Sequence, residues 1–244
     1  EAERGMVFEK FSSRENDIVT GIIQRMENKN VYIDLGKAEA ILTPNEQIPG
    51  EIYQYHDRMK TYIVEVKKTS KGPQIMVSRT HPGLLKRLFE LEVPEIHDGL
   101  VEIKSVAREP GMRSKISVYT KDENIDPVGA CVGHKGMRVQ TIVNELRGEK
   151  IDIVKYSSEP DQYVANALSP AKVVSTEVLE EEKICRVIVP DYQLSLAIGK
   201  EGQNARLAAK LTGWKIDIKS ESQAAEEAEQ GAQEVGVAYE ADED

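Results

Sequence analysis

Apolar and polar residues alternate along the first third of the chain, in the period-two pattern typical of short, half-buried strands. Turn-forming residues at 27–30, 49–50 and 71–73 separate the alternating segments. These segments are residues 18–23, 30–36, 40–42, 61–66 and 74–79. Five short strands within about 65 residues predict a small closed barrel, because closure leaves no exposed sheet edge.

The hydrophobic period changes at Pro82, after which apolar residues fall at helical spacing. Strands are expected at residues 100–106 and 115–120. A short helical run then leads into the tetrad Gly133-His134-Lys135-Gly136, and an amphipathic helix follows it. Residues 150–154, which begin Lys-Ile-Asp-Ile, have the pattern of a closing strand.

The same order of elements recurs between residues 161 and 218. The tetrad Gly199-Lys200-Glu201-Gly202 lies 66 residues after the first tetrad, and a second Lys-Ile-Asp-Ile segment lies 65 residues after the first. Helices are expected at 161–168, 192–198 and 203–211, and strands at 172–178, 184–189 and 215–218. Repetition at one spacing predicts two copies of an α+β module, each ordered helix–strand–strand–helix–loop–helix–strand.

Charge is distributed unevenly along the chain, whose formal net charge is −10. Residues 221–244 hold nine acidic and no basic residues, so the preceding part carries a net charge of only −1. Between Arg58 and Arg87 there are eight basic residues and one acidic residue, Glu65. Local patches set the field that a phosphate backbone meets, so the whole-chain charge does not exclude a nucleic-acid partner. Each single lysine is still best explained as a solvated charge.

Both ends of the chain lack the pattern of a folded module. Residues 1–14 are charged and weakly patterned, as expected of a linker or the end of an upstream helix. The chain opens with Glu-Ala-Glu-Arg and no start methionine, so we expect a fragment of a longer protein. The acidic tail, residues 221–244, is rich in Ala, Glu and Gln and has little to bury, so we expect it to be disordered or only transiently helical.

Several functional classes find no support in the residues. The two cysteines, Cys131 and Cys185, lie outside any metal-ligand spacing and are interpreted as small buried hydrophobes. No apolar run approaches the roughly 18 residues of a membrane span. Asp152 and Asp217 are matched carboxylates, but the repeat itself explains them. We therefore expect a soluble, cytoplasmic protein that is not an enzyme and holds no cofactor or metal.

The two Gly-x-x-Gly tetrads carry the chemistry that the residues predict most clearly. Glycines have no Cβ, so a sugar–phosphate backbone can press against such a loop, and the following helix directs its N-terminal amides at phosphate. His134, Lys135 and Lys200 add positive charge there, whereas Glu201 weakens it. The alternative is that these glycines only cap helices, which the duplicated context disfavours.

An apolar groove beside each tetrad is the expected seat of unstacked bases. Such a groove takes about four bases of single-stranded RNA per module. The residues expected to line it are Ile151, Ile153, Ile216 and Ile218.

These tetrads and their flanking elements resemble type II KH domains, and the barrel resembles an S1-type OB fold. The barrel resemblance rests on residues 21–23, 31–36 and 78–79. A barrel followed by two such modules resembles the NusA family of bacterial transcription factors, as do the segments 77–84, 126–129, 132–133 and 194–200. The fold class implied is multidomain: an all-β S1-type OB-fold barrel followed by two α+β type II KH domains.

The resemblance implies domain boundaries, a function and partners. The implied S1-type domain is 15–80, the first KH domain 81–158 and the second 159–220. Such proteins grip nascent single-stranded RNA and modulate pausing, termination and antitermination. RNA polymerase and other transcription factors are the implied partners of the full-length protein. The family's polymerase-binding domain is missing from this sequence, and we expect a monomer with no membrane contact.

The resemblance also extends the set of expected RNA contacts. Gln203, Asn204 and Arg206, on the helix after the second tetrad, become neighbours of the RNA. In the barrel, side chains that could stack on bases or pack at a strand edge are Tyr32, Tyr53, Tyr55 and His56. Arg108, Arg113 and Lys115 flank the first KH sheet, as phosphate contacts or as solvated charges.

Two other functions fit the same modules. S1 and KH modules also accompany phosphorolytic ribonucleases, but these have a large catalytic core that this sequence lacks. A ribosome-associated RNA-binding protein is the second alternative.

Overall fold

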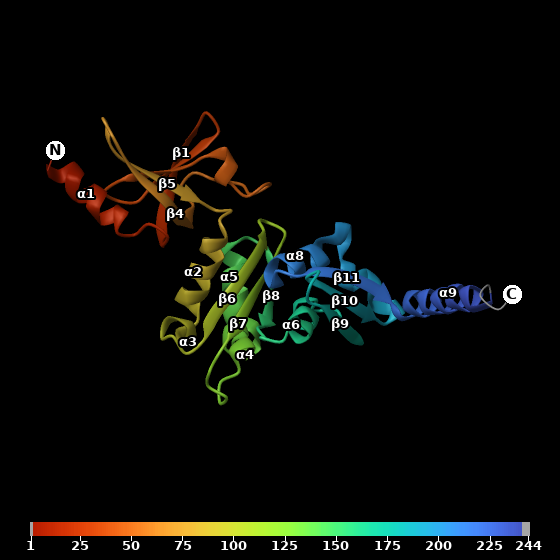
Figure 1. Ribbon diagram of the computed structural model, residues 1–244. Coiled ribbons are helices and arrows are strands. Elements are labelled where there is room, and N and C mark those ends of the chain that lie inside the picture. The colour runs from red at the N-terminus through yellow and green to blue at the C-terminus, as the bar shows by residue number, and fades with distance from the viewer. Residues whose placement is uncertain (1, 241–244) are drawn as a thin grey trace.

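The structure, a computed structural model, describes the backbone of residues 2–240 and the side chains through residue 232. Figure 1 shows three units in chain order, a barrel followed by two α/β units, with the two ends of the chain at opposite sides. We call the two α/β units the first repeat (residues 81–158) and the second repeat (residues 159–220).

The barrel closes as the alternating pattern predicts. Its strands are β1 (Ile18–Glu27), β2 (Asn30–Asp34), β3 (Glu39–Leu42), β4 (Arg58–Thr69) and β5 (Gly72–Ser78), in the order β1-β2-β3-β5-β4. Ile33, Ile63 and Ile75 fill the interior and are fully buried. Helix α1 (Ala2–Ser12) adds Phe11 to the same core, with 2% of that residue exposed. Residues 2–12 are thus a helix packed on the barrel.

The first repeat is a three-stranded sheet with helices on one face. Its elements are α2 (Pro82–Glu92), α3 (Pro94–His97), β6 (Glu102–Glu109), β7 (Arg113–Tyr119), α4 (Pro127–Val132), α5 (Met137–Glu145) and β8 (Lys150–Lys155). Central strand β7 pairs antiparallel with β6 and parallel with β8. Ile116 and Val118 of β7 point into a core that Leu84, Leu88 and Ile142 supply from the helices.

The second repeat has the same topology. Its elements are α6 (Pro160–Ala167), β9 (Ser175–Leu179), β10 (Ile184–Val189), α7 (Leu194–Ile198), α8 (Gln203–Thr212) and β11 (Lys215–Ser220). Strand β10 pairs antiparallel with β9 and parallel with β11. Strand β9 begins three residues later than residue 172, where the pattern predicts it, because the Lys172 amide donates to the Gln193 side chain instead of joining the sheet.

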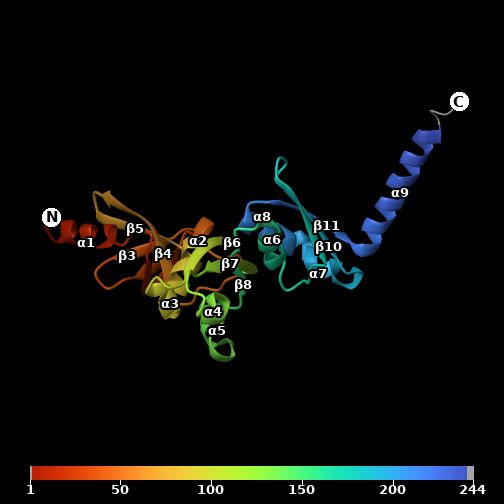
Figure 2. The same ribbon diagram turned by 60° about the horizontal axis from the view of Figure 1, so that its bottom comes forward.

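The described part of the tail is helical, so of the two expectations for 221–244, disorder or a transient helix, the first is wrong there. Residues Glu221–Glu240 form helix α9, which projects away from the second repeat in Figure 2. Ala, Glu and Gln are strong helix formers, so this composition forms a helix without a core to bury. The first two turns are tied down, because the Ser222 amide donates to Asp191 (3.1 Å) and Lys219 pairs with Glu227 (2.6 Å). Residues 241–244 lie outside the described residues.

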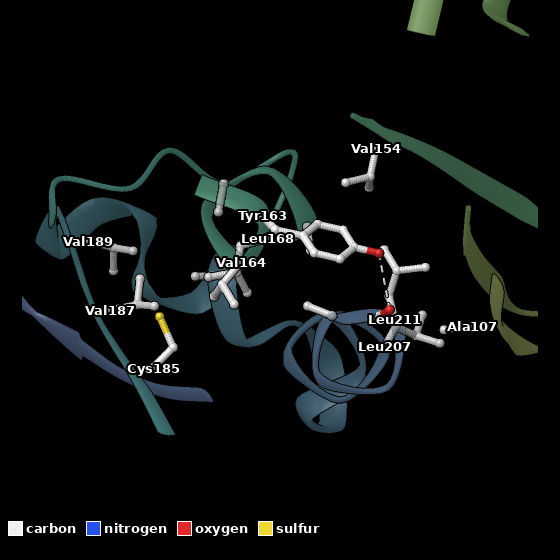
Figure 3. Packing of buried hydrophobic residues seen from close by; sticks show 14 residues of the cluster. Ala107, Val154, Tyr163, Val164, Leu168, Cys185, Val187, Val189, Leu207 and Leu211 are labelled. Carbon is white, nitrogen blue, oxygen red and sulfur yellow. Dashed lines mark hydrogen bonds between the residues drawn. The ribbon is translucent and has the colours of Figure 1, made fainter. Parts of the chain in front are cut away.

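The second face of the first sheet is closed by the second repeat. Ala107 and Val154, from the first repeat, share one core cluster with Tyr163, Leu207 and Leu211 of α6 and α8. Figure 3 shows Tyr163 reaching from α6 toward Val154 and Leu211. Because this core is continuous across the junction, the two repeats form one packed unit.

Hydrogen bonds between polar groups also cross this junction. The Tyr163 hydroxyl hydrogen-bonds to Ser117 Oγ at 2.8 Å and to the Leu211 carbonyl oxygen at 3.2 Å. Arg206 of α8 donates to Glu109 of β6 at 2.7 Å. These contacts fix the orientation of the second repeat on the first.

Arg79 joins the barrel to the first repeat. Its side chain is fully buried, and its guanidinium forms a two-point ion pair with Glu51 (2.7 and 3.0 Å). The same group donates to the carbonyl oxygens of Lys60 in the barrel and Glu145 in α5. Burial alone would lower the pKa of Arg79, but the hydrogen bonds and charge of Glu51 outweigh it and raise the pKa. Arg79 is therefore charged, and it bonds to both units at once.

We predict that Arg79→Met destabilises the protein by about 3 kcal/mol, because it leaves the Glu51 carboxylate buried without its partner. Urea denaturation followed by circular dichroism measures this change. The matched control is Arg58→Met at an exposed position, with an expected change within about 0.5 kcal/mol. Adding Glu51→Gln to Arg79→Met should restore part of the loss. Equal midpoints for Arg79→Met and Arg58→Met would contradict the role given to Arg79.

Candidate nucleic-acid interface

The two tetrads form loops of nearly identical backbone conformation, named here the first loop (Gly133–Gly136) and the second loop (Gly199–Gly202). The leading glycines have φ/ψ of 79°/172° and 80°/168°. The closing glycines have φ of 75° in both loops, as the left-handed region favours. In each loop the amide of the closing glycine donates to the carbonyl oxygen of the leading one at 3.1 Å. The repeat therefore extends to the geometry of the loops.

The two glycines of each loop have different roles. A Cβ on Gly133 would lie 2.6 Å from Arg138 Cγ, and one on Gly199 would lie 2.6 Å from the Asn204 amide nitrogen. A Cβ on Gly136 would meet nothing within 4 Å, and one on Gly202 only Arg206 Nη1 at 4.0 Å. The leading glycines therefore allow tight packing inside the module. The closing glycines face open space, where a ligand backbone can approach.

A side chain five residues after each leading glycine holds its loop in place. Arg138 Nη1 donates to the Ala130 carbonyl oxygen at 2.7 Å and to Glu95 at 2.8 Å. Asn204 Nδ2 donates at 3.0 Å to the carbonyl oxygens of Ala197 and Leu168. Both side chains thus tie the helix before the loop to the helical segment that opens the module.

Asn204 is therefore wrongly predicted as a direct neighbour of the RNA. It is 3% exposed, and its amide faces the module interior. Arg138 was not predicted from the sequence, because its equivalence to Asn204 is seen only when the two repeats are aligned on their tetrads. The first loop is held by a half-exposed ion pair with Glu95, and the second by buried, neutral hydrogen bonds.

The remaining loop residues agree with their expected placement. His134, Lys135, Lys200 and Glu201 are all exposed. Exposed apolar side chains, which the pattern did not single out, flank both loops: Met137 beside the first (66% exposed), and Leu196 and Ile198 beside the second (42% and 37%). Each loop therefore combines weak charge with an apolar border.

The side chains of Gln203 and Arg206 are partly engaged in contacts within the protein. The Gln203 side chain is half-buried, and its amide nitrogen is turned away from solvent. Arg206 is 43% exposed, but its guanidinium contacts Glu109 and the Glu201 carbonyl oxygen. Arg206 therefore links the second loop to strand β6 of the first repeat.

The four isoleucines expected to line the grooves are all half-buried. Ile151 and Ile153 lie on β8 beside α4, and Ile216 and Ile218 lie on β11 beside α7. Each pair therefore lies on the edge strand beside the helix that leads into its loop. That position is compatible with base contact, which stays a prediction.

The phosphate contacts predicted on the first sheet are wrong at two positions. The Arg108 side chain is fully buried and paired with Glu149 at 3.0 Å. Lys115 is also fully buried, and its Nζ donates to Asp152 (2.9 Å) and to the Ser169 carbonyl oxygen (2.7 Å). Both cations are used inside the protein: Arg108 pairs within the first repeat, and Lys115 lies on the face of the sheet that the second repeat covers.

Asp152 sits at the centre of this buried network. Arg113, 23% exposed, also pairs with Asp152, at 2.7 Å. Burial acts to raise the pKa of Asp152, but hydrogen bonds from Arg113 and the charge of Lys115 outweigh it and lower the pKa. For Lys115, burial disfavours the charged amine and lowers its pKa, although the Asp152 carboxylate lies nearby. Asp152 is thus an ionised, structural carboxylate at physiological pH. Arg113 is largely engaged in its ion pair with Asp152.

The barrel aromatics divide between core and surface. Tyr53 is 8% exposed and accepts from the Ile48 amide, so of the two alternatives for this residue packing holds and base stacking does not. Tyr55 is 67% exposed, with the exposed His56 ring 3.8 Å away in an edge-on arrangement. Tyr32 is half-buried, and the Arg25 guanidinium lies 4.2 Å from its ring centroid. Tyr55 and His56 are the barrel aromatics most available to a base.

Other kinds of site are not found in the described part of the chain. Among residues 2–240 no group of three or more His, Cys, Asp or Glu side chains is arranged to hold a metal ion. No described helix is both long and apolar enough to cross a membrane. Cys131 and Cys185 are buried, and burial raises the pKa of both thiols.

Comparison with protein-family models matches each of the three units. Residues 12–78 match the S1 RNA binding domain. Residues 79–156 match the NusA-like first KH domain, and residues 160–226 match the NusA-like second KH domain.

Curated relatives match across the junctions as well. Transcription termination/antitermination protein NusA of Halalkalibacterium halodurans is 71% identical over 93% of this chain, and that of Bacillus subtilis is 70% identical over 93%. The chain spans 59% and 61% of the lengths of these two relatives. NusA of Mycobacterium bovis is 50% identical over 91% of this chain, which spans 67% of that relative.

We predict that Asn204→Ala loosens the second loop and leaves the first unchanged. Losing both hydrogen bonds from Nδ2 should cost about 1–2 kcal/mol and speed hydrogen–deuterium exchange of the amides at 199–203. Asn144→Ala, at an exposed position of α5, is the matched control. Unchanged exchange at 199–203 in Asn204→Ala would show that Asn204 does not hold the loop.

Proposed function

The chain belongs to the NusA family, and we propose that its two KH loops together hold one single strand of nascent RNA at the transcribing polymerase. By holding the transcript the chain would modulate pausing, termination and antitermination, in line with the names of its relatives. The observation that carries the proposal is the pair of like loops on one rigid body. The relatives are named as transcription factors rather than as enzymes, which favours this function over RNA cleavage.

The rigidity of the tandem determines how RNA would be bound. A strand held at one loop is presented to the other at high effective concentration, because the loops cannot tumble independently. The shared core around Tyr163 and the Arg206–Glu109 pair restrict that motion. One copy of the chain is enough for this binding, since both loops belong to it.

The loop charges indicate modest intrinsic affinity. Lys135 and Lys200 are the lysines of the two loops, and Glu201 opposes Lys200 within the second. Phosphate contacts dominate nucleic-acid affinity, so two lysines supply little of it. We infer that RNA polymerase, which would tether the full-length protein near the emerging transcript, supplies the remaining effective affinity.

Replacing the closing glycines by aspartate should weaken RNA binding without unfolding the repeats. A Cβ at Gly136 or Gly202 points into open space, and aspartate tolerates the left-handed conformation better than most residues. We expect Gly136→Asp and Gly202→Asp each to weaken binding of single-stranded RNA about tenfold, and the double variant more than either, through like-charge repulsion of phosphate. Fluorescence anisotropy with a labelled oligonucleotide measures the affinity.

The matched controls are Gly136→Asn and Gly202→Asn, which place a side chain of the same shape without the charge. They should lose less affinity for single-stranded RNA than the aspartate variants. Melting temperatures of all variants show whether the fold is kept. Wild-type affinity for RNA in a folded double aspartate variant would contradict the proposal.

A further inference from the structure

Arg206 lies at the edge of the second loop, on the side where a ligand backbone can approach. A Cβ on Gly202 would lie 4.0 Å from Arg206 Nη1, and the Arg206 side chain is 43% exposed. The equivalent position in the first repeat, 66 residues earlier, is the neutral Gln140. The second loop therefore has a guanidinium at its open side where the first loop has an amide.

A carboxylate of the first repeat holds this guanidinium. Glu109, the last residue of β6, accepts from Arg206 Nε at 2.7 Å, and the same oxygen, Oε1, lies 2.5 Å from Nη2. Arg206 Nη1 donates to the Glu201 carbonyl oxygen at 3.0 Å. Glu109 thus neutralises the charge of Arg206 at the place where an RNA phosphate would use it.

The Arg206–Glu109 pair is easier to open than the buried pair at Arg79. Arg79 bonds to both carboxylate oxygens of Glu51, and the two side chains are 0% and 2% exposed. Arg206 bonds to one oxygen of Glu109, and these side chains are 43% and 19% exposed. Ion pairs open to solvent contribute little to stability, so a phosphate can replace the carboxylate readily. The shared core around Tyr163 keeps the two repeats together when the pair opens.

Two buried polar atoms near this pair make no hydrogen bond to any described residue. They are Glu109 Oε2, which accepts, and Gln203 Nε2, which donates. Gln203 precedes Arg206 by three residues and Leu207 by four, so it lies on the face of α8 that packs on β6. A buried carboxylate that loses its partner needs another donor, and the Gln203 amide on this face can supply one.

We propose that Glu109 takes the place of an RNA phosphate on Arg206 and releases the guanidinium when the transcript reaches the second loop, with the Gln203 amide then bonding to the carboxylate. Glu109 is thus a positioning residue on the first repeat that sets the RNA affinity of the second loop. The proposal rests on the proposed function, because it requires RNA at Gly199–Gly202. Its ligand is the phosphate backbone of single-stranded RNA, selected by charge.

The test measures the affinity of this chain for an oligouridine of about eight nucleotides, the number that two KH modules take at four bases each. Fluorescence anisotropy compares the wild type with Glu109→Gln, which removes the charge and keeps the size of the side chain. The matched control is Glu102→Gln, which removes an exposed, paired carboxylate from the same strand. Melting temperatures show whether each variant is folded.

We expect Glu109→Gln to bind the oligouridine about threefold more tightly, because RNA no longer has to open a half-exposed ion pair. Glu102→Gln should change the affinity by much less. Arg206→Gln should weaken binding and reduce the slope of log K against log salt by about 0.7, the value of one phosphate contact of a single strand.

Two double variants separate the exchange from other roles of Glu109. In the Arg206→Gln background, Glu109→Gln should gain no affinity, whereas simple repulsion between Glu109 and phosphate would still be relieved there. Gln203→Leu should weaken RNA binding when Glu109 is present and leave it unchanged in the Glu109→Gln background, since only the carboxylate needs the amide.

Unchanged or weaker RNA binding by a folded Glu109→Gln variant would overturn the proposal. An equal gain in Glu102→Gln, or in Glu109→Gln on the Arg206→Gln background, would also overturn it. An equal loss from Gln203→Leu in both backgrounds would contradict the part given to Gln203. Absence of binding in the wild type and in every variant would contradict the proposed function, on which the exchange depends.

Discussion

The rest of the structure depends on the burial of the second face of the first KH sheet. Strand β7 alternates apolar with polar residues, so a solvated outer face would be expected, yet five consecutive residues of the strand are buried. The second repeat closes that face, and the buried polar side chains Lys115 and Ser117 on it bond to Asp152 and Tyr163. A buried polar group without a partner costs more than its hydrogen bond contributes, so the orientation of the repeats is tightly specified.

That constraint turns two RNA-binding modules into one surface. The helix that carries the second loop is the helix that packs on β6 and β7, so the loop cannot move without disturbing the shared core. Arg206 reinforces this at the loop itself by pairing with Glu109 of the first repeat. The barrel joins through Arg79, a buried cation whose partners lie on both sides of the junction. Charge is thus used inside the molecule to align the units, and the exposed cations are left to the ligand.

The sequence predicted the strands of the barrel, the duplicated module and the position of both loops, because hydrophobic period and glycine spacing are local signals. Its failures share one physical cause. Arg108, Lys115 and Asn204 were expected at the RNA surface, but their partners Glu149, Asp152 and Leu168 come from distant segments. Tyr53 is a core residue for the same reason. The extent of the tail helix was not predicted for a different reason: a segment without a core was expected to be disordered or only transiently helical, although its composition favours a helix.

The central claim is that the two loops keep one fixed separation, so that a single strand meets both. Pulsed electron–electron resonance between spin labels on His134→Cys and Lys200→Cys tests it most directly, since both positions are exposed and the native cysteines are buried. The account predicts one narrow distance distribution that is unchanged when single-stranded RNA is added. A broad distribution in the free protein, or one that shifts on binding RNA, would contradict it.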